Sequence, residues 1–252
     1  MQNLIFSTTS KEIKKLNFIK ADPDIDRHYA GSDTKELFET NLKTQDDNWF
    51  YRTNPVNYSV NSSGYRTKEF KTINWADSIV VFGCSVVFGT GVDDQHTIPA
   101  MIEQQSGIPT INMGIGGSSI MSSFHNSIIL NQRYPAPRAI VHLWTDYSRT
   151  VYYYKKHVEH YGVWDIADNN YIYHWNKDEE HAKCQALFAQ LASRQIWNNR
   201  TKYYEASLFS ATQKLLGCDK LNDSYDKARD LMHNGIKTNE KAARQILNNL
   251  EL

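Results

Sequence analysis

The sequence contains 252 residues, and its 28 Lys+Arg against 28 Asp+Glu give a formal net charge of zero. A chain of this length can bury the core of one large domain, and a hydrophobic fraction of 40% is too high for a disordered chain. The balanced charge argues against a nucleic-acid binder, because neutralising phosphates requires an excess of Lys and Arg.

The distribution of apolar residues disfavours two further classes of protein. No apolar run approaches the roughly 20 residues that span a bilayer, so we expect no membrane partner. The first residues, MQNLIFSTTSKEIKK, contain no apolar segment long enough for a signal peptide, which favours a cytoplasmic protein. A phage-encoded protein is compatible with the same observations.

Candidate metal and disulfide sites are unconvincing. Cys84, Cys184 and Cys218 are widely spaced, with no CxxC pair and no zinc-ligand spacing, so we expect three reduced thiols. The segment HVEH at 157–160 does not have the HExxH order of a zinc helix. We therefore expect neither a metal nor an organic cofactor.

The first 76 residues are polar and show no sustained alternation of apolar residues. Residues 33–42 are compatible with a short helix, whereas the stretch from Asn54 to Arg66 indicates turns and extended pieces. No linker separates this part from the remainder. We therefore expect a single domain, 1–252, on which residues 1–76 pack as an N-terminal extension.

A regular alternation of strands and helices begins at residue 78. Short apolar runs predict buried strands, and amphipathic segments between them predict helices. In the first helix Thr97 is a candidate N-cap, and Gly107 stands where the helix should end. The predicted strands are 78–83, 108–114 and 138–144, and the predicted helices are 97–107 and 118–134. His142, inside the third strand, is predicted to be a core histidine with its hydrogen bonds satisfied.

The second half of the chain is less regular. An aromatic and polar stretch, 147–176, opens an insertion that we place at 147–200. The helix in this insertion carries four apolar residues on one face: Cys184, Leu187, Phe188 and Leu191. Residues 202–211 are a candidate fourth strand. An amphipathic helix at 235–250 closes the chain, with these residues facing inward: Ala242, Ala243, Ile246, Leu247 and Leu250.

The order strand–helix–strand–helix–strand at short spacing is typical of right-handed βαβ units. The expected fold class is α/β, a three-layer α/β/α sandwich around a central, mainly parallel sheet. In such a sheet, ligands bind beyond the carboxyl ends of the strands. The residues that follow each predicted strand are therefore the candidates for a functional site.

Polar residues and glycines stand at these positions. They are Gly83-Cys84-Ser85, Asn112 to Gly117, Thr145-Asp146, and the later segment Asp230 to His233. Together they supply a nucleophile, backbone donors for an oxyanion, a general base and its orienting carboxylate, as acyl transfer requires. The chain has no P-loop, no GxGxxG and no GxSxG motif, so three common alternatives are excluded.

Three sequence blocks resemble those of the SGNH (GDSL-type) serine hydrolases. They are VVFGCSVVFGTGVDDQHTIPAMIEQ, NMGIGGSS and ARDLMHNGIKTNEKAARQIL, in the family's order over residues 78–250. Upstream, VNYSVNSSGYRTKEF looks like the Asn-x-x-Gly-Tyr-Arg segment of some bacterial and phage members, including polysaccharide O-acetylation proteins. The resemblance implies the flavodoxin-like SGNH hydrolase fold.

The resemblance also assigns roles to individual residues. Ser85 would be the nucleophile, His233 the base and Asp230 its orienting carboxylate. The backbone N–H groups of Ser85 and Gly117 would form the oxyanion hole. The family normally adds an Asn side chain in its third block; here Thr145 stands in that place, and a hydroxyl is a shorter donor than an amide.

The implied activity is that of a serine esterase, which removes a small acyl group such as acetyl from a carbohydrate or another polar ester. Trp144, Asp146 and Tyr147 are weak candidates for substrate contacts, and Asp146 could instead pair with Arg149. The tyrosines and tryptophans of the insertion are either a sugar-stacking wall or packing residues. Two alternatives stay open: a carbohydrate O-acyltransferase of the same fold, or a catalytically weak structural or binding member such as a phage particle protein.

Overall fold

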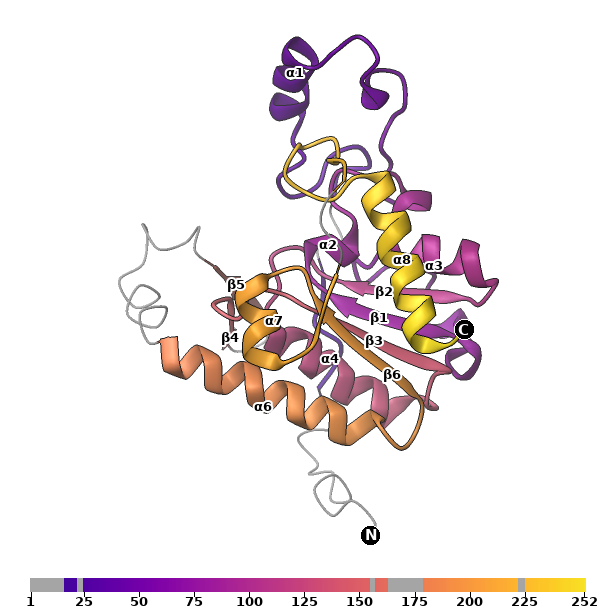
Figure 1. The fold of residues 1–252 in the computed structure, drawn as a ribbon, viewed down its shortest axis with the longest axis vertical. Helices are drawn as coiled ribbons and strands as arrows, with labels where there is room; N and C mark the ends of the chain where they lie inside the picture. Colours follow the sequence, from indigo (N-terminus) through magenta and orange to yellow (C-terminus); the bar gives the residue numbers. More distant parts are fainter. Residues whose placement is uncertain (1–15, 22–24, 155–156, 163–178, 222–224) are drawn as a thin grey trace.

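The computed structural model describes residues 16–21, 25–154, 157–162, 179–221 and 225–252. A five-stranded parallel sheet forms its centre, with strand order β2-β1-β3-β6-β7 (Figure 1). The strands are β1 (Ile79–Gly83), β2 (Thr110–Gly114), β3 (Ala139–Trp144), β6 (Lys202–Ser207) and β7 (Asp219–Lys220). The predicted α/β class and parallel sheet are confirmed.

Helices cover both faces of this sheet (Figure 1). The helices α3 (Ile98–Ser106) and α8 (Ile236–Leu250) pack together on one face, and α4 (Ile120–Arg133) and α6 (Glu179–Trp197) pack together on the other. Alternate residues of β1 enter the two layers: Ile79 and Val81 contact the first, Val80 and Phe82 the second. The predicted three-layer sandwich is therefore confirmed.

The ends of the predicted helices follow from local hydrogen bonding. The Thr97 hydroxyl accepts the N–H of Ala100 at 3.3 Å, and Gly107 ends α3 at a φ of 70°. The five inward residues predicted for the last helix are all buried in α8. The predicted fourth strand is too long, because β6 stops at Ser207 and a new helix, α7 (Ser210–Leu216), begins three residues later.

Three of the four residues of the apolar face predicted for α6 point to solvent, and only Leu187 packs, partly buried, against the core. Phe188 is 68% exposed and Leu191 57% exposed, and Cys184 is also exposed. Smaller and polar residues make the buried face instead, together with the last turn: Ala186, Ala189, Gln190, Ser193, Ile196 and Trp197. Alanine and serine allow the backbones of α4 and α6 to approach closely. The small residues of α6, and not its large apolar residues, therefore form the face that packs against the rest of the protein.

Several short elements complete the fold, and of these the sequence indicated only the short helix near residues 33–42. The insertion contains an antiparallel hairpin of β4 (Thr150–Tyr154) and β5 (His157–Tyr161), while residues 163–178 of the predicted aromatic stretch lie outside the described part. The remaining helices are α1 (Lys35–Thr44), α2 (Ser85–Phe88), and four single 3₁₀ turns at Phe50–Arg52, Phe70–Thr72, Trp75–Asp77 and Asp94–His96. Within the described residues, no helix is long and apolar enough to cross a membrane.

Arg66 fastens the N-terminal segment to the main sheet. Its side chain is 2% exposed, and its guanidinium donates to the backbone carbonyls of four residues: Asn57, Phe88, Gly89 and Val92. It also pairs with the Asp94 carboxylate at 2.7 Å and lies over the Tyr58 ring, 4.6 Å from its centroid. Since these carbonyls include the last residue of α2, Phe88, and two residues just after it, Gly89 and Val92, Arg66 holds the end of α2 and the following segment in place.

His142 is a buried histidine without hydrogen-bond partners. Its ring stacks between Phe82 and Trp144, with centroid separations of 4.9 and 4.4 Å, and neither ring nitrogen meets a partner in the described parts of the chain. The predicted core position is therefore right, but the predicted hydrogen bonds are missing. Burial lowers the pKa of this imidazole to about 3, because the charged form would lose its water.

We expect His142→Phe to reduce the acid sensitivity of the fold. The unfolded chain binds a proton at this histidine below its ordinary pKa of about 6.5, whereas the folded chain binds it only near pH 3, so stability is lost as pH falls between these values. The free energy of unfolding of the variant should rise relative to the native chain by up to about 1.4 kcal/mol per pH unit in this window. Urea unfolding at pH 7, 6, 5 and 4 measures it. The control is His28→Gln, at an exposed histidine, which should leave the dependence of the unfolding free energy on pH unchanged. An unchanged dependence in His142→Phe would contradict the prediction.

Candidate active site

Ser85 is the first residue of α2 and lies two residues beyond the carboxyl end of β1. The short helix can lie against β2 because Gly114 has no side chain: a Cβ there would come within 2.2 Å of the Phe88 backbone nitrogen. The Asn112 amide adds a hydrogen bond of 2.9 Å to the Val87 carbonyl. The end of the neighbouring strand therefore fixes the backbone that presents the Ser85 hydroxyl.

His233 and Asp230 occupy a tight turn before α8. The Asp230 Oδ1 accepts the backbone N–H groups of Met232 and His233, each at 3.0 Å. Leu231, which lies between Asp230 and Met232, adopts a φ of 59°. This left-handed conformation costs a residue with a side chain about 1–2 kcal/mol. The two hydrogen bonds to the carboxylate hold this strained turn.

The three side chains form one continuous hydrogen-bonded chain. The Ser85 Oγ lies 2.8 Å from His233 Nε2, and His233 Nδ1 lies 2.6 Å from Asp230 Oδ2. Burial of Asp230 would raise the pKa of its carboxyl group, but the His233 side chain and the further hydrogen bonds outweigh burial and lower it to about 2. The carboxylate is therefore ionised at neutral pH and can orient the imidazole.

A fourth side chain joins the site from the N-terminal segment. The Ser32 hydroxyl donates to Asp230 Oδ2 at 2.7 Å and lies 3.5 Å from His233 Nδ1. The neighbouring Asp33 forms a buried ion pair with Arg229, 2.7 Å between Oδ2 and the guanidinium, which sets Ser32 beside the turn. Sequence reasoning missed Ser32 because nothing in its local pattern indicates a partner almost 200 residues away.

The positions expected to form an oxyanion hole follow the carboxyl ends of β1, β2 and β3, which are neighbouring strands of the sheet. Gly117 is half-buried with a φ of 70°, and no described residue accepts its backbone N–H or that of Ser85. Thr145 is 2% exposed, and its hydroxyl has no hydrogen-bond partner within the described segments. An unpaired buried hydroxyl costs about 1–3 kcal/mol, which a bound group that accepts its hydrogen would recover.

A cleft of about 420 Å³ opens beside the Ser85 and His233 side chains. Apart from these two residues, its lining consists of Val86, Arg149, Leu208, Phe209, Lys220, Leu221, Lys227, Met232 and Asn234. Most of these residues follow the carboxyl ends of β3, β6 and β7, as expected for a parallel sheet. These residues meet because of the order of the strands in the sheet, which the sequence analysis did not predict.

The three weak substrate-contact candidates do not line this cleft. Trp144 is 1% exposed and its indole N–H donates to Glu205 at 3.1 Å, so it is a core residue and the expectation is wrong for it. Tyr147 donates to Glu179 at 2.8 Å, away from Ser85. Asp146 accepts the N–H of Ser148 at 2.9 Å, and the Arg149 N–H donates to its backbone carbonyl.

No cluster of three metal-ligating side chains exists among the residues that the structure describes. His160, from the HVEH segment, lies with Nδ1 3.2 Å from the Ser122 hydroxyl. Burial lowers the pKa of His160 to about 4. This histidine therefore packs the hairpin against α4 as a neutral ring.

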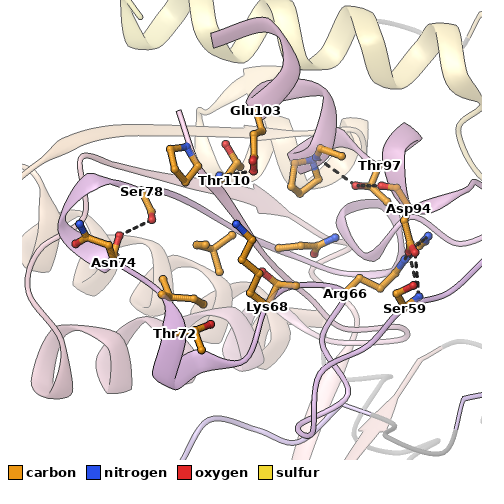
Figure 2. A pocket seen from close by; sticks show the side chains of 17 residues that line it. Ser59, Arg66, Lys68, Thr72, Asn74, Ser78, Asp94, Thr97, Glu103 and Thr110 are labelled. Atoms are coloured by element: carbon orange, nitrogen blue, oxygen red, sulfur yellow. Dashed lines mark hydrogen bonds and ion pairs between the residues drawn. The ribbon is translucent and has the colours of Figure 1, made fainter. Parts of the chain in front are cut away.

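A second cavity, of about 520 Å³, lies along the outer edge of β2 (Figure 2). Its polar groups bond to one another: Arg66 to Asp94, the Ser78 hydroxyl to the Asn74 carbonyl, and the Thr110 N–H to Glu103. It contains neither Ser85 nor His233. Although it is larger, it is a gap between the N-terminal segment and the sheet, and the cleft at Ser85 is the candidate active site.

No protein-family model and no curated protein matches this sequence. Solved structures do resemble it. An acetyl xylan esterase from Butyrivibrio proteoclasticus has a TM-score of 0.49 and 11% identity, over 71% of this chain and 65% of that chain. A member of the lipolytic G-D-S-L family from Veillonella parvula has a TM-score of 0.41 and 10% identity, over 68% and 96%.

A carbohydrate esterase family 2 enzyme from Corynascus thermopiles, which also carries a carbohydrate-binding domain, has a TM-score of 0.43 and 12% identity. This likeness covers 69% of the present chain and 67% of that enzyme. At such identities the likeness concerns the fold, and the chemistry has to come from the side chains described above. The structural neighbours of this chain are esterases of the SGNH/GDSL lipolytic type.

Proposed function

We propose that the protein is a serine esterase that hydrolyses a small acyl ester through an acyl-enzyme intermediate. The observation that carries this proposal is the hydrogen-bonded chain from Ser85 through His233 to Asp230. A serine hydroxyl is a weak nucleophile until a neighbouring imidazole takes its proton, and the imidazole works only when its other nitrogen is held. Both conditions are met at this site.

In the proposed reaction, Ser85 Oγ attacks the carbonyl carbon of the ester while its proton passes to His233 Nε2. The backbone N–H groups of Ser85 and Gly117 donate to the oxyanion, with the Thr145 hydroxyl as the proposed third donor. The intermediate collapses, His233 returns the proton to the departing alkoxide, and the acyl group stays on Ser85. Water then attacks the acyl-enzyme by the same steps, which releases the acid and restores the serine.

The proposed substrate is an ester with a short acyl group, such as an acetyl group on a carbohydrate. A cleft of about 420 Å³ next to the nucleophile suits a small acyl group and part of the alcohol. The Asn-x-x-Gly-Tyr-Arg segment does not favour acyl transfer to a sugar, because the Arg66 guanidinium is bonded to backbone carbonyls and is 2% exposed.

Active-site labelling tests the proposal directly. We expect a fluorophosphonate to label the native protein at Ser85, as located by mass spectrometry of the peptides, and p-nitrophenyl acetate to be hydrolysed. Prior denaturation is the control and should abolish labelling. A folded protein that is neither labelled nor active would refute the esterase. Consumption of an acyl donor only when a sugar is added would identify a transferase instead.

We expect Ser32→Ala to lower kcat by about tenfold, because the variant loses a hydrogen bond that holds the Asp230 carboxylate in place. Hydrogen bonds to charged groups contribute roughly 1.5–3 kcal/mol to the stability of such an arrangement. Without this donor the Asp230 carboxylate attracts the His233 proton more strongly, so the acid limb of the rate profile should move to higher pH. Ser32→Thr keeps the hydroxyl and should restore both values. Rate profiles between pH 5 and 9 measure the effect; an unmoved acid limb in Ser32→Ala would show that the contact is only structural.

A further inference from the structure

The described residues that line the cleft at Ser85 carry an excess of positive charge, although the chain as a whole is neutral. Of the described residues that line it, Arg149, Lys220 and Lys227 carry a positive charge and none carries a carboxylate. With 28 basic and 28 acidic residues in the chain, an even mixture would place both signs there. The excess of one sign is therefore local to the cleft.

The three cations come from three separate parts of the fold. Arg149 follows β3, and its guanidinium carbon lies 5.5 Å from the centroid of the Phe209 ring, which also lines the cleft. Lys220 belongs to β7 at the edge of the sheet. Lys227 lies on the loop that carries the Asp230–His233 turn, and its backbone forms a β-bridge with Asn234. The sheet edge and this bridge fix the backbones that carry the charges.

Two described acidic groups of the same loop, Asp226 and Asp230, form other contacts. The Asp226 carboxylate accepts the N–H groups of Lys237 and Thr238, at 3.0 and 2.8 Å, where α8 begins. The buried Asp230 carboxylate accepts from Ser32 and from the catalytic turn. Within the described residues no carboxylate pairs with Lys227, so its charge acts on whatever enters the cleft.

We propose that the preferred substrate is an ester that carries a carboxylate close to the bond that is cleaved, such as an acyl ester of an acidic carbohydrate. This inference rests on the proposed esterase function and adds the charge of its substrate. Arginine and lysine bind carboxylates through charge-assisted hydrogen bonds. The carboxylate would lie between Arg149 and Lys227 while the acyl carbonyl faces Ser85.

Two chromogenic esters matched in acyl group test the inference: p-nitrophenyl acetate and its m-carboxy derivative. We expect kcat/KM to be about tenfold higher for the carboxylate ester at low ionic strength and the ratio to approach one in concentrated NaCl, which screens such charges. Lys227→Gln should lower this ratio about threefold, and Lys227→Glu should lower it further. An exposed lysine outside the cleft, Lys71→Gln, is the control and should leave the ratio unchanged.

Binding provides a second readout that does not depend on turnover. In calorimetry with the Ser85→Ala variant, we expect the m-carboxy derivative of p-nitrophenol to bind more tightly than p-nitrophenol itself. Adding Lys227→Gln to this variant should weaken the binding of the carboxy derivative. Equal rates for the two esters, or equal binding of the two phenols, overturns the charge preference and leaves the esterase intact. Selective binding of the anion by a protein that hydrolyses neither ester supports the charged cleft and refutes the esterase.

Discussion

Ser85→Ala is expected to reduce kcat for p-nitrophenyl acetate by about 10⁴-fold or more, and His233→Ala by a similar factor. The double variant should lose little beyond either single one. The reason is that both side chains act in one step: without the imidazole the hydroxyl keeps its proton, and without the hydroxyl the imidazole has nothing to activate. Steady-state kinetics with a correction for spontaneous hydrolysis measure all three variants.

The control for these variants is Ser59→Ala, an exposed serine far along the chain from the catalytic turn. It should retain full activity. Circular dichroism and thermal melting should confirm that each variant is folded, which is expected because the Asp230 carboxylate keeps its hydrogen bonds to Ser32 and to the turn when the His233 ring is removed. Turnover that survives in Ser85→Ala would place the nucleophile elsewhere. Additive losses in the double variant would mean that the two residues act in separate steps.

Arg66→Met is expected to destabilise the fold by about 3–5 kcal/mol. Methionine fills a similar volume, but it leaves the carbonyls of Phe88, Gly89 and Val92 without the guanidinium as their buried donor. It also removes the cation that pairs with the Asp94 carboxylate. Breaking a buried network by removing one partner has costs of this size, which for a chain of this length lowers Tm by roughly 10 °C or more. Urea unfolding followed by tryptophan fluorescence gives the difference.

A matched control is Arg27→Met, because Arg27 is exposed and contributes only its backbone carbonyl to a hydrogen bond. It should change stability by no more than about 0.5 kcal/mol. Arg66→Lys should fall between the two, since an ammonium retains the charge but cannot reach four carbonyls and a carboxylate at once. A loss below about 1 kcal/mol in Arg66→Met would show that water replaces the guanidinium without difficulty.

The parallel sheet could be predicted because its strands are short apolar runs that end in recognisable turns. The segments that contain Ser85 and Gly117 became candidates because they follow such strands, and Asp230 and His233 stand close together before an amphipathic helix. The role of each of these residues came from the resemblance to the SGNH hydrolases. These features are local, since each depends on residues close together in the chain. Hydrophobic period and turn chemistry are visible at that range.

The features that sequence missed depend on how distant segments meet. Ser32 reaches Asp230 only because the buried Asp33–Arg229 pair ties the two loops together. The solvent-facing side of α6 carries Phe188 and Leu191, against the rule that large apolar residues mark the packed face. Trp144 was expected near substrate because it ends β3, but the pleat turns its side chain toward Glu205 in the interior.

The site also has a consequence for folding kinetics. The bond between Ser85 and His233 spans 148 residues of chain, and the bond between Ser32 and Asp230 spans 198. Contacts between such distant residues form late, because closing a long loop costs entropy before the contact repays it. The segments that carry Ser32 and His233 must therefore dock before the proposed catalytic site is complete. During refolding, recovery of esterase activity should lag behind recovery of helical ellipticity, and activity would then report the completion of folding.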